Sequence, residues 1–154
     1  MSVLVETTLG DIVIDLRPEY APLTCLNFVK LCKLRYYDGN LFFAISAGFT
    51  AQTGDPTGTG KGGESVFCQL DQQSGKNVSR FFDDEIDARA THERMGTVGM
   101  AHTLGGPNQN ASQWYITLAS ELNSELDGKF TVFGNVEEDD NNVLRKLSEL
   151  YVDK

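Results

Sequence analysis

Short runs of β-prone residues, separated by turn residues, recur along this chain and limit its fold more than any other feature. The first sixteen residues are typical of a hairpin, because Ile12, Ile14 and Leu16 alternate with other residues after a turn around Gly10. Further strands are predicted over residues 41–45, 49–53, 97–101, 114–118 and 131–136. So many short strands favour a mainly β protein.

Two stretches have helical periodicity instead. The first begins near Pro22, which suits the first turn of a helix. Its apolar face comprises Cys25, Leu26, Phe28, Val29, Leu31 and Cys32. The second follows the acidic run 137–140 and Asn141, which suit a helix N-terminus. Its apolar face comprises Val143, Leu144, Leu147, Leu150 and Tyr151. Strands and helices together predict a closed antiparallel β-barrel capped by two helices, in one domain over residues 1–154.

The composition argues against several classes of function. Thirteen Lys and Arg residues against 22 Asp and Glu residues give a net charge of −9, so this chain is not expected to bind nucleic acid itself. No apolar run is long enough to cross a membrane. Three cysteines and two histidines lack the short paired spacings of a zinc site, so no metal and no cofactor are expected. Asp83 and Asp84 are interpreted as solvated loop residues rather than as an acid–base couple.

One glycine-rich motif only superficially resembles a phosphate-binding site. Residues 58–63 read GTGKGG and formally satisfy GxGxxG. A dinucleotide site also needs a strand directly before the motif and a helix after it, whereas here Asp55 and Pro56 precede it and residues 64–67 follow without helical periodicity. A P-loop is excluded as well, because Gly62 follows Lys61 where Ser or Thr is required. We predict instead a structured loop over residues 54–63.

Seven short segments are informative together, because of the order in which they follow one another along the chain. They are residues 36–42 (YYDGNLF), 48–55 (GFTAQTGD), 58–65 (GTGKGGES), 82–85 (FDDE), 96–101 (GTVGMA), 110–116 (NASQWYI) and 126–134 (LDGKFTVFG). In this order and spacing they resemble the cyclophilins, the barrel-fold peptidyl-prolyl cis-trans isomerases, over nearly the whole chain. The segments most similar to one nuclear branch, the peptidyl-prolyl isomerase-like 4 group, are residues 7–16, 25–28, 52–60 and 151–154. In that branch a cyclophilin domain is followed by an RNA-recognition motif.

The resemblance implies a reaction that needs no nucleophile, metal or cofactor. A prolyl amide prefers trans by only ~0.5–1 kcal/mol, but its rotation faces a barrier of about 18–20 kcal/mol because rotation breaks the amide resonance. A cyclophilin holds the proline ring in an apolar pocket and favours the twisted amide electrostatically. Proline-containing peptides or proteins are therefore the expected partners, and a monomer is the expected state.

The resemblance also assigns residues to a groove. Phe49, Tyr115 and Leu126 would line the proline pocket, with Tyr115 where phenylalanine is usual. The flanking peptide would be bound by side chains or backbone of Gln52, Ala101, His102, Thr103 and Gln113. For each of these residues, the alternative is packing within the barrel.

Several positions depart from the family pattern. Ala44 stands where the family has the arginine that hydrogen-bonds the prolyl amide, and losing one preorganised donor costs ~2.7–4 kcal/mol, or about 10²–10³ in rate. The other departures are Thr50 for methionine, His102 for asparagine, Glu125 for tryptophan and Phe130 for histidine. The usual tryptophan donates a hydrogen bond to cyclosporin. Because an ionised Glu125 cannot donate, we expect weak or no cyclosporin binding.

Three functions remain open at this point. The first is a peptidyl-prolyl isomerase of much reduced activity, in which Arg35, Lys61 or Lys129 does not replace the missing arginine. The second is a non-catalytic proline-peptide binding module of a nuclear RNA-processing or splicing protein. The third is a scaffold whose groove binds no prolyl peptide. We favour binding with residual catalysis, in the nucleus.

The C-terminal end of the chain carries a further expectation. Cyclophilins continue past the last helix into a strand that pairs with the first strand. The printed chain ends at Lys154, before such a strand. If nothing replaces that strand, residues 3–7 are predicted to form an unpaired edge.

Overall fold

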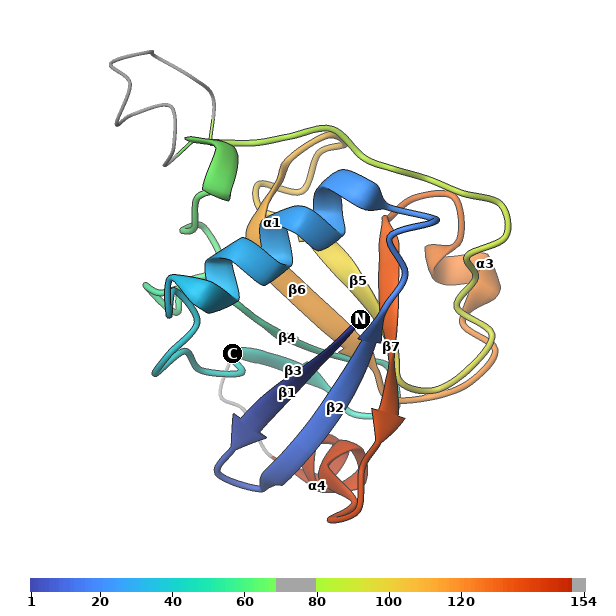
Figure 1. The fold of residues 1–154 in the computed structure, drawn as a ribbon. Helices are drawn as coiled ribbons and strands as arrows, with labels where there is room; N and C mark the ends of the chain where they lie inside the picture. The colour runs from blue at the N-terminus through green and yellow to red at the C-terminus, as the bar shows by residue number, and fades with distance from the viewer. Residues whose placement is uncertain (69–79, 151–154) are drawn as a thin grey trace.

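Seven antiparallel strands form one curled sheet in the part of the chain that the computed structural model describes, residues 1–68 and 80–150 (Figure 1). The strands are β1 (Ser2–Thr7), β2 (Gly10–Leu16), β3 (Ala44–Ser46), β4 (Thr50–Thr53), β5 (Thr97–His102), β6 (Asn110–Thr117) and β7 (Val132–Glu138). Their order across the sheet is β1-β2-β7-β5-β6-β4-β3. The predicted mainly β fold is confirmed. Tyr151 and the rest of 151–154 lie outside the described residues.

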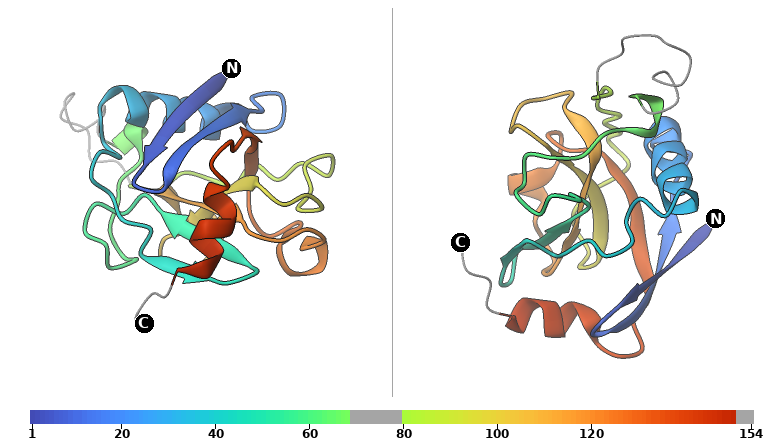
Figure 2. Two further views of the ribbon diagram at one scale, coloured as in Figure 1. Left: turned by 90° about the horizontal axis from the view of Figure 1, so that it is seen from below. Right: turned by 90° about the vertical axis from the view of Figure 1, so that its left-hand side faces the viewer.

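Helices cover two different sides of this sheet, as Figures 1 and 2 show. α1 (Pro22–Lys33) packs against β6, and α4 (Val143–Glu149) contacts β2, β3 and β4. A short helix, α3 (Asn123–Leu126), was not predicted and lies to one side. None of the helices in the described residues is long and apolar enough to span a lipid bilayer.

The apolar face predicted for α1 holds except at one residue. Pro22 occupies the first turn, as expected. Cys25, Phe28 and Leu31 are buried. Leu26 is 41% exposed because it lies on the same side of the helix as Leu23, which also faces solvent.

The start of α4 differs from the expectation. β7 runs through the acidic stretch to Glu138, so part of that stretch is strand. The Asp139 carboxylate accepts hydrogen bonds from the backbone N–H groups of Val143 (2.5 Å) and Leu144 (3.0 Å). Asp139, rather than Asn141, therefore satisfies the free amide groups of the first helical turn.

The inner face of the sheet holds the main core. Its buried residues on β2, β5 and β6 are Ile12, Ile14, Leu16, Val98, Met100, Trp114 and Ile116. Phe28 from α1 packs against them, with its ring centroid 5.4 Å from that of Trp114 and 5.1 Å from that of Phe133. Because strand residues alternate in direction, the intervening side chains point to the outer face. The candidate site lies on that outer face.

β6 begins at Asn110, before the predicted strand, and all of its residues are buried. Its first residues are small or polar and therefore lack the composition typical of a strand. Hydrogen bonds to main-chain groups hold some of their side chains instead. Ser112 Oγ donates to the carbonyl oxygen of Gly54 (2.7 Å), and Asn110 Nδ2 donates to that of Phe82 (3.0 Å). The surrounding loops thus support the first half of β6, which its own sequence does not predict.

β1 forms an edge of the sheet, because in the described residues it pairs only with β2. Two cavities of about 630 and 450 Å³ lie along it, and Tyr37, Asn40 and Trp114 line both. The Trp114 indole nitrogen and the Asn40 side-chain oxygen are buried there without a hydrogen-bond partner in the described part of the chain. In the described residues β1 is the edge expected for residues 3–7 when no further strand pairs with it.

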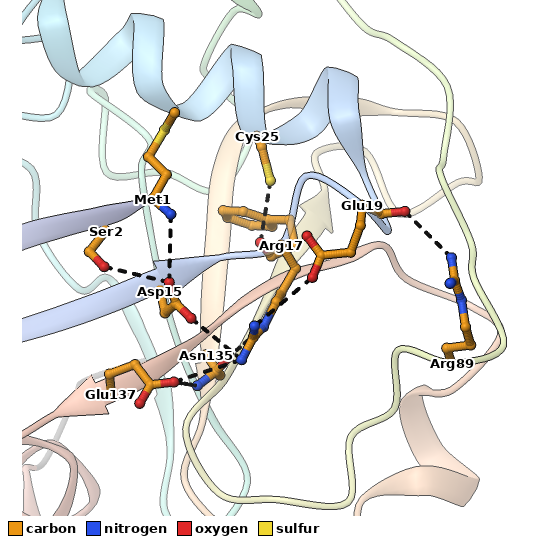
Figure 3. A network of polar contacts seen from close by, with 10 residues as sticks. Met1, Ser2, Asp15, Arg17, Glu19, Cys25, Arg89, Asn135 and Glu137 are labelled. Carbon is orange, nitrogen blue, oxygen red and sulfur yellow. Dashed lines mark hydrogen bonds and ion pairs between the residues drawn. The ribbon is translucent and has the colours of Figure 1, made fainter.

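An exposed polar network centred on Arg17 joins β2 to β7 (Figure 3). One guanidinium nitrogen lies 3.4 Å from the Asp15 carboxylate and 3.8 Å from that of Glu137. Arg17 Nε donates a hydrogen bond to the side-chain oxygen of Asn135 (3.2 Å). Because the Arg17 side chain is 38% exposed, water screens these ion pairs and their contribution to stability is small.

Candidate functional site

Strand register places four residues in one row across the outer face of the sheet. Ala44 on β3 pairs with Gln52 on β4. Gln52 in turn pairs with Tyr115 on β6, and Tyr115 pairs with Gly99 on β5. Residues directly opposite each other in antiparallel strands carry their side chains on the same face, with Cβ atoms about 4.5–5.5 Å apart. The row therefore runs from an exposed strand edge at Ala44 to the bare backbone of Gly99.

Gly99 makes room for the Tyr115 ring. A Cβ atom at position 99 would overlap the phenol ring and its hydroxyl group. Tyr115 is buried together with Ala101 and Leu126, and Phe130 packs around them. These residues form a second, smaller apolar cluster that is separate from the main core.

A cavity of about 250 Å³ opens beside this cluster. It is lined by Phe49, Thr50, Gln52, Ala101, His102, Gly105, Tyr115, Leu126 and Phe130. All except Gly105 are positions assigned to the groove by the resemblance. Leu126 comes from α3, the short helix that the sequence did not predict. None of these lining residues is a lysine or an arginine, so Arg35, Lys61 and Lys129 are not among them.

Four of the assigned positions do not line the cavity, namely Ala44, Thr103, Gln113 and Glu125. Ala44 and Glu125 are exposed, whereas Thr103 is buried. Gln113 is fully buried and donates its side-chain N–H to the carbonyl oxygen of Gly62 (2.9 Å). Its side-chain oxygen accepts a hydrogen bond from Gln52 Nε2 (2.8 Å). Gln113 therefore orients Gln52 without lining the cavity itself.

His102 forms one wall of the cavity together with Phe130, and their ring centroids are 4.7 Å apart. His102 Nε2 lies 2.8 Å from Asp84 Oδ1, which also accepts a hydrogen bond from Asn110 Nδ2 (2.7 Å). Burial opposes ionisation of Asp84, but these hydrogen bonds outweigh it and lower the pKa of the carboxyl group. With a side chain only 12% exposed, Asp84 is not the solvated loop residue that the sequence suggested, whereas Asp83 is exposed.

Behind the cavity, the Tyr115 hydroxyl group meets a buried histidine. His92 Nε2 lies 2.6 Å from the hydroxyl oxygen, and His92 Nδ1 lies 2.6 Å from Asp127 Oδ1. The His92 side chain is fully buried, and this burial lowers the pKa of its imidazole, although the Asp127 carboxylate acts in the opposite direction. Burial raises the pKa of the Tyr115 phenol. Both groups are therefore uncharged at neutral pH.

Comparison with known proteins decides the family. Residues 2–154 match the family model described as cyclophilin type peptidyl-prolyl cis-trans isomerase/CLD. The chain belongs to the cyclophilin family. It is 52% identical over 153 residues to peptidyl-prolyl cis-trans isomerase CYP59 of Arabidopsis thaliana, and 49% identical over 156 residues to human peptidyl-prolyl cis-trans isomerase-like 4. These matches cover 99% and 100% of this cyclophilin but only 29% and 30% of the two relatives.

A solved structure supports the same assignment. The fold is similar to that of a Cryptosporidium parvum cyclophilin type peptidyl-prolyl cis-trans isomerase, crystallised in the presence of the dipeptide Ala-Pro. The TM-score is 0.86 at 36% sequence identity, and the match covers 100% of this cyclophilin and 89% of the other chain. The family inferred from the ordered sequence segments is therefore confirmed.

Two residues behind the cavity of this cyclophilin were missed by sequence reasoning. His92 and Asp127 lie on either side of Tyr115 in the sequence, and no motif connects the three. Only the path of the loops after β6 and before β5 brings them together. The one hint in the sequence was that the chain has just two histidines, and this hint did not identify Tyr115 or Asp127 as the partners of His92.

The glycine-rich loop over residues 54–63 is organised around Asp55. The Asp55 carboxylate accepts hydrogen bonds from the backbone N–H groups of Thr57 (2.9 Å), Gly60 (2.7 Å) and Gly62 (3.1 Å). Burial opposes ionisation of Asp55, but these bonds outweigh it and lower the pKa of the carboxyl group. Since a carboxylate already occupies the amide donors, they are not free to bind a phosphate group.

Proposed function

We propose that this cyclophilin binds prolyl peptides in the cavity beside Tyr115 and isomerises them only slowly. The observation that carries the proposal is the pairing of Ala44 with Gln52. Gln52 lines the cavity, and Ala44 lies on the same face of the sheet, so an arginine at position 44 would extend over the cavity. Alanine provides neither a hydrogen-bond donor nor a charge there.

The lining of the cavity supports the binding half of this proposal. Phe49, Tyr115, Leu126 and Phe130 supply aromatic and aliphatic surface of the kind that holds an apolar ring. Gln52 adds a polar group at the same cavity, and its hydrogen bond to the Gln113 side chain holds it in place. A few oriented polar groups in an apolar cavity fix the direction in which a bound peptide lies.

The slow rate follows from what the cavity lacks. Rotation about a prolyl amide has to overcome a barrier of about 18–20 kcal/mol, which an oriented donor lowers by stabilising the twisted amide. No lysine or arginine is among the described residues that line the cavity, so the lining itself offers no guanidinium or ammonium donor in place of an arginine at position 44. We expect the loss of this one donor to reduce the rate by about 10²–10³. Residual catalysis remains because the cavity still orients the amide.

A second candidate function is a non-catalytic prolyl-peptide binding module of a nuclear RNA-processing protein. Ala44, which provides no hydrogen-bond donor, favours it, and the similar human peptidyl-prolyl cis-trans isomerase-like 4 is a longer protein, of which the match covers 30%. In such a module, recognition of a proline-containing partner would be the function, and the nucleus would be its location.

Exchange NMR spectroscopy on an Ala-Pro peptide, with catalytic amounts of the protein, tests the proposal. Cis-trans exchange modestly faster than in the protein-free control, together with shifted peptide signals, is the expected result. Shifted signals without faster exchange would favour the non-catalytic module. If neither appears for Ala-Pro and Gly-Pro peptides, the cavity binds no prolyl peptide and the proposal is wrong.

A further inference from the structure

The hydrogen bonds behind Tyr115 have a defined direction. Asp127 Oδ1 accepts hydrogen bonds from both the backbone N–H and the ring Nδ1 of His92, at 2.7 and 2.6 Å. Asn123 Nδ2 donates to the other oxygen of Asp127 (2.9 Å). An ionised carboxylate is acceptor-only, so these partners assign the proton of the neutral His92 ring to Nδ1. His92 Nε2 is then an acceptor, and the Tyr115 hydroxyl group donates to it.

The hydrogen bond to His92 engages the hydroxyl group, which is the one polar group of the Tyr115 side chain. The hydroxyl group lies against the backbone of Gly99 on one side and His92 on another. The His92 and Tyr115 rings are stacked, with centroids 5.9 Å apart. The ring of Tyr115 lines the cavity while its hydroxyl is bound behind it, so the cavity receives an apolar aromatic surface from a tyrosine.

We propose that His92 and Asp127 are positioning residues that hold the Tyr115 hydroxyl group behind the cavity and so let a tyrosine serve as its apolar floor. The inference rests on the proposed binding of prolyl peptides in this cavity. His92 and Asp127 do not touch the substrate; they act through the Tyr115 ring. Asp127 sets the tautomer of His92, and His92 sets the direction of the hydroxyl group.

The same bonds make the floor of the cavity sensitive to acid. A protonated His92 donates from Nε2, so the hydroxyl oxygen of Tyr115 becomes the acceptor of this bond. The hydroxyl hydrogen then loses its partner and has to turn toward another acceptor. The Asp127 carboxylate and the Tyr115 phenol are the titratable groups that contact the His92 ring. On the opposite wall, His102 contacts Asp84 rather than the His92 ring. Affinity for a prolyl peptide should therefore fall at acid pH through His92.

Titration of an Ala-Pro peptide by NMR, with the whole chain, tests the inference at neutral pH. His92→Phe retains a ring but removes the acceptor, and we expect the dissociation constant to rise about fivefold or more, as for a buried hydroxyl group without a partner. His92→Phe combined with Tyr115→Phe removes the hydroxyl group as well and should return the affinity to within about twofold of the original protein. A double variant as weak as His92→Phe alone would show that His92 acts by packing only and would overturn the inference.

Peptide affinity measured over a series of pH values tests the inference even if the His92→Phe variant does not fold. Because burial lowers the pKa of His92 below its ordinary 6.5, the original protein should lose affinity only as the pH falls below that value, and Tyr115→Phe alone should not. The loss should persist in His102→Asn, whatever that change does to the affinity itself. Equal pH profiles for the original protein and Tyr115→Phe would contradict the inference.

Failure of the proposed function has a separate signature. If the original protein binds no prolyl peptide, the positioning role falls with it. The ¹⁵N shifts of the His92 ring then still report whether Nδ1 carries the proton. A proton on Nε2 would contradict the hydrogen-bond directions themselves.

Discussion

The two ends of the row across the outer face of the sheet differ in how they are held. At one end Tyr115 is buried, packed over Gly99 and hydrogen-bonded to His92. At the other end Ala44 is exposed on the edge strand β3. The buried end belongs to the packing of the protein, whereas a side chain at position 44 reaches solvent and contributes little to stability. We therefore expect peptide binding to depend little on the side chain at position 44, whereas the rate of isomerisation should depend on it.

Introducing an arginine at position 44, the exposed end of the row, should have the largest effect on the rate of isomerisation. Ala44→Arg places a guanidinium group beside Gln52, and we expect prolyl isomerisation to accelerate by about 10²–10³-fold, measured by exchange NMR. Ala47→Arg is the matched control, since Ala47 is exposed just beyond the end of β3. That variant should leave the rate unchanged. If prolyl isomerisation is equally slow in both variants, the absence of an arginine at position 44 is not what limits the rate.

Disrupting the buried end should have the next largest effect. Gly99→Ala forces a Cβ atom into the Tyr115 ring, and such overpacking lowers the free energy of unfolding by about 1–3 kcal/mol. Urea denaturation measures this loss, and peptide titration should show loss of binding. In the control Gly106→Ala, the new Cβ meets only the flexible Gln109 side chain, at 3.2 Å. Equal stability of the two variants would contradict the tight packing at Gly99.

The wall opposite the Tyr115 floor offers a smaller, pH-dependent test. Asp84→Asn removes the charge that accepts hydrogen bonds from His102 and Asn110, and we expect a loss of about 1–2 kcal/mol at neutral pH. The folded-state pKa of Asp84 lies below its unfolded value of 3.8. Its contribution to stability is therefore present above that value and disappears as the pH falls through the folded-state pKa.

Chemical denaturation at neutral and at strongly acid pH checks this prediction. The difference between the original protein and Asp84→Asn should shrink as the pH falls. Asp83→Asn alters the exposed neighbour and should change stability little at either pH. A difference that stays constant with pH would show that the ionised form of Asp84 is not what stabilises the wall.

The smallest effect is expected in the Arg17 network, away from both ends of the row. Arg17→Met removes several ion pairs, but because Arg17 is 38% exposed the loss should stay below about 1 kcal/mol and decrease with added salt. Arg145→Met, which removes the exposed pair with Glu149, is the control. Urea denaturation of both variants measures this. A loss greater than that of Asp84→Asn would contradict the distinction between exposed and buried networks.

The sequence predicted best those elements that depend on local pattern. The alternation of Ile12, Ile14 and Leu16 predicted β2, and Pro22 predicted the start of α1. It failed where long-range contacts replace local preference. The first half of β6 and the helix α3 have little local signal, and Asp139 rather than Asn141 caps α4.

The candidate site divides in the same way. The order of the motifs indicated which positions belong to the groove, and eight of the twelve assigned residues line one cavity. Their roles in binding and catalysis remain predictions. The sequence could not indicate that Gln113 is buried and hydrogen-bonded to Gln52 and Gly62, because these partners lie far away in the chain.

By itself, the sequence determined the family, the mainly β fold and the absence of an arginine at position 44. These depend on the order of residues along the chain and on the alternation that sorts side chains to two faces. Only the tertiary structure decided that Ala44, Gln52, Tyr115 and Gly99 share one row, and that His92 and Asp127 meet the Tyr115 hydroxyl group. Strand register and loop paths join residues far apart in the chain, and the stability of a buried polar group depends on the partner it meets there.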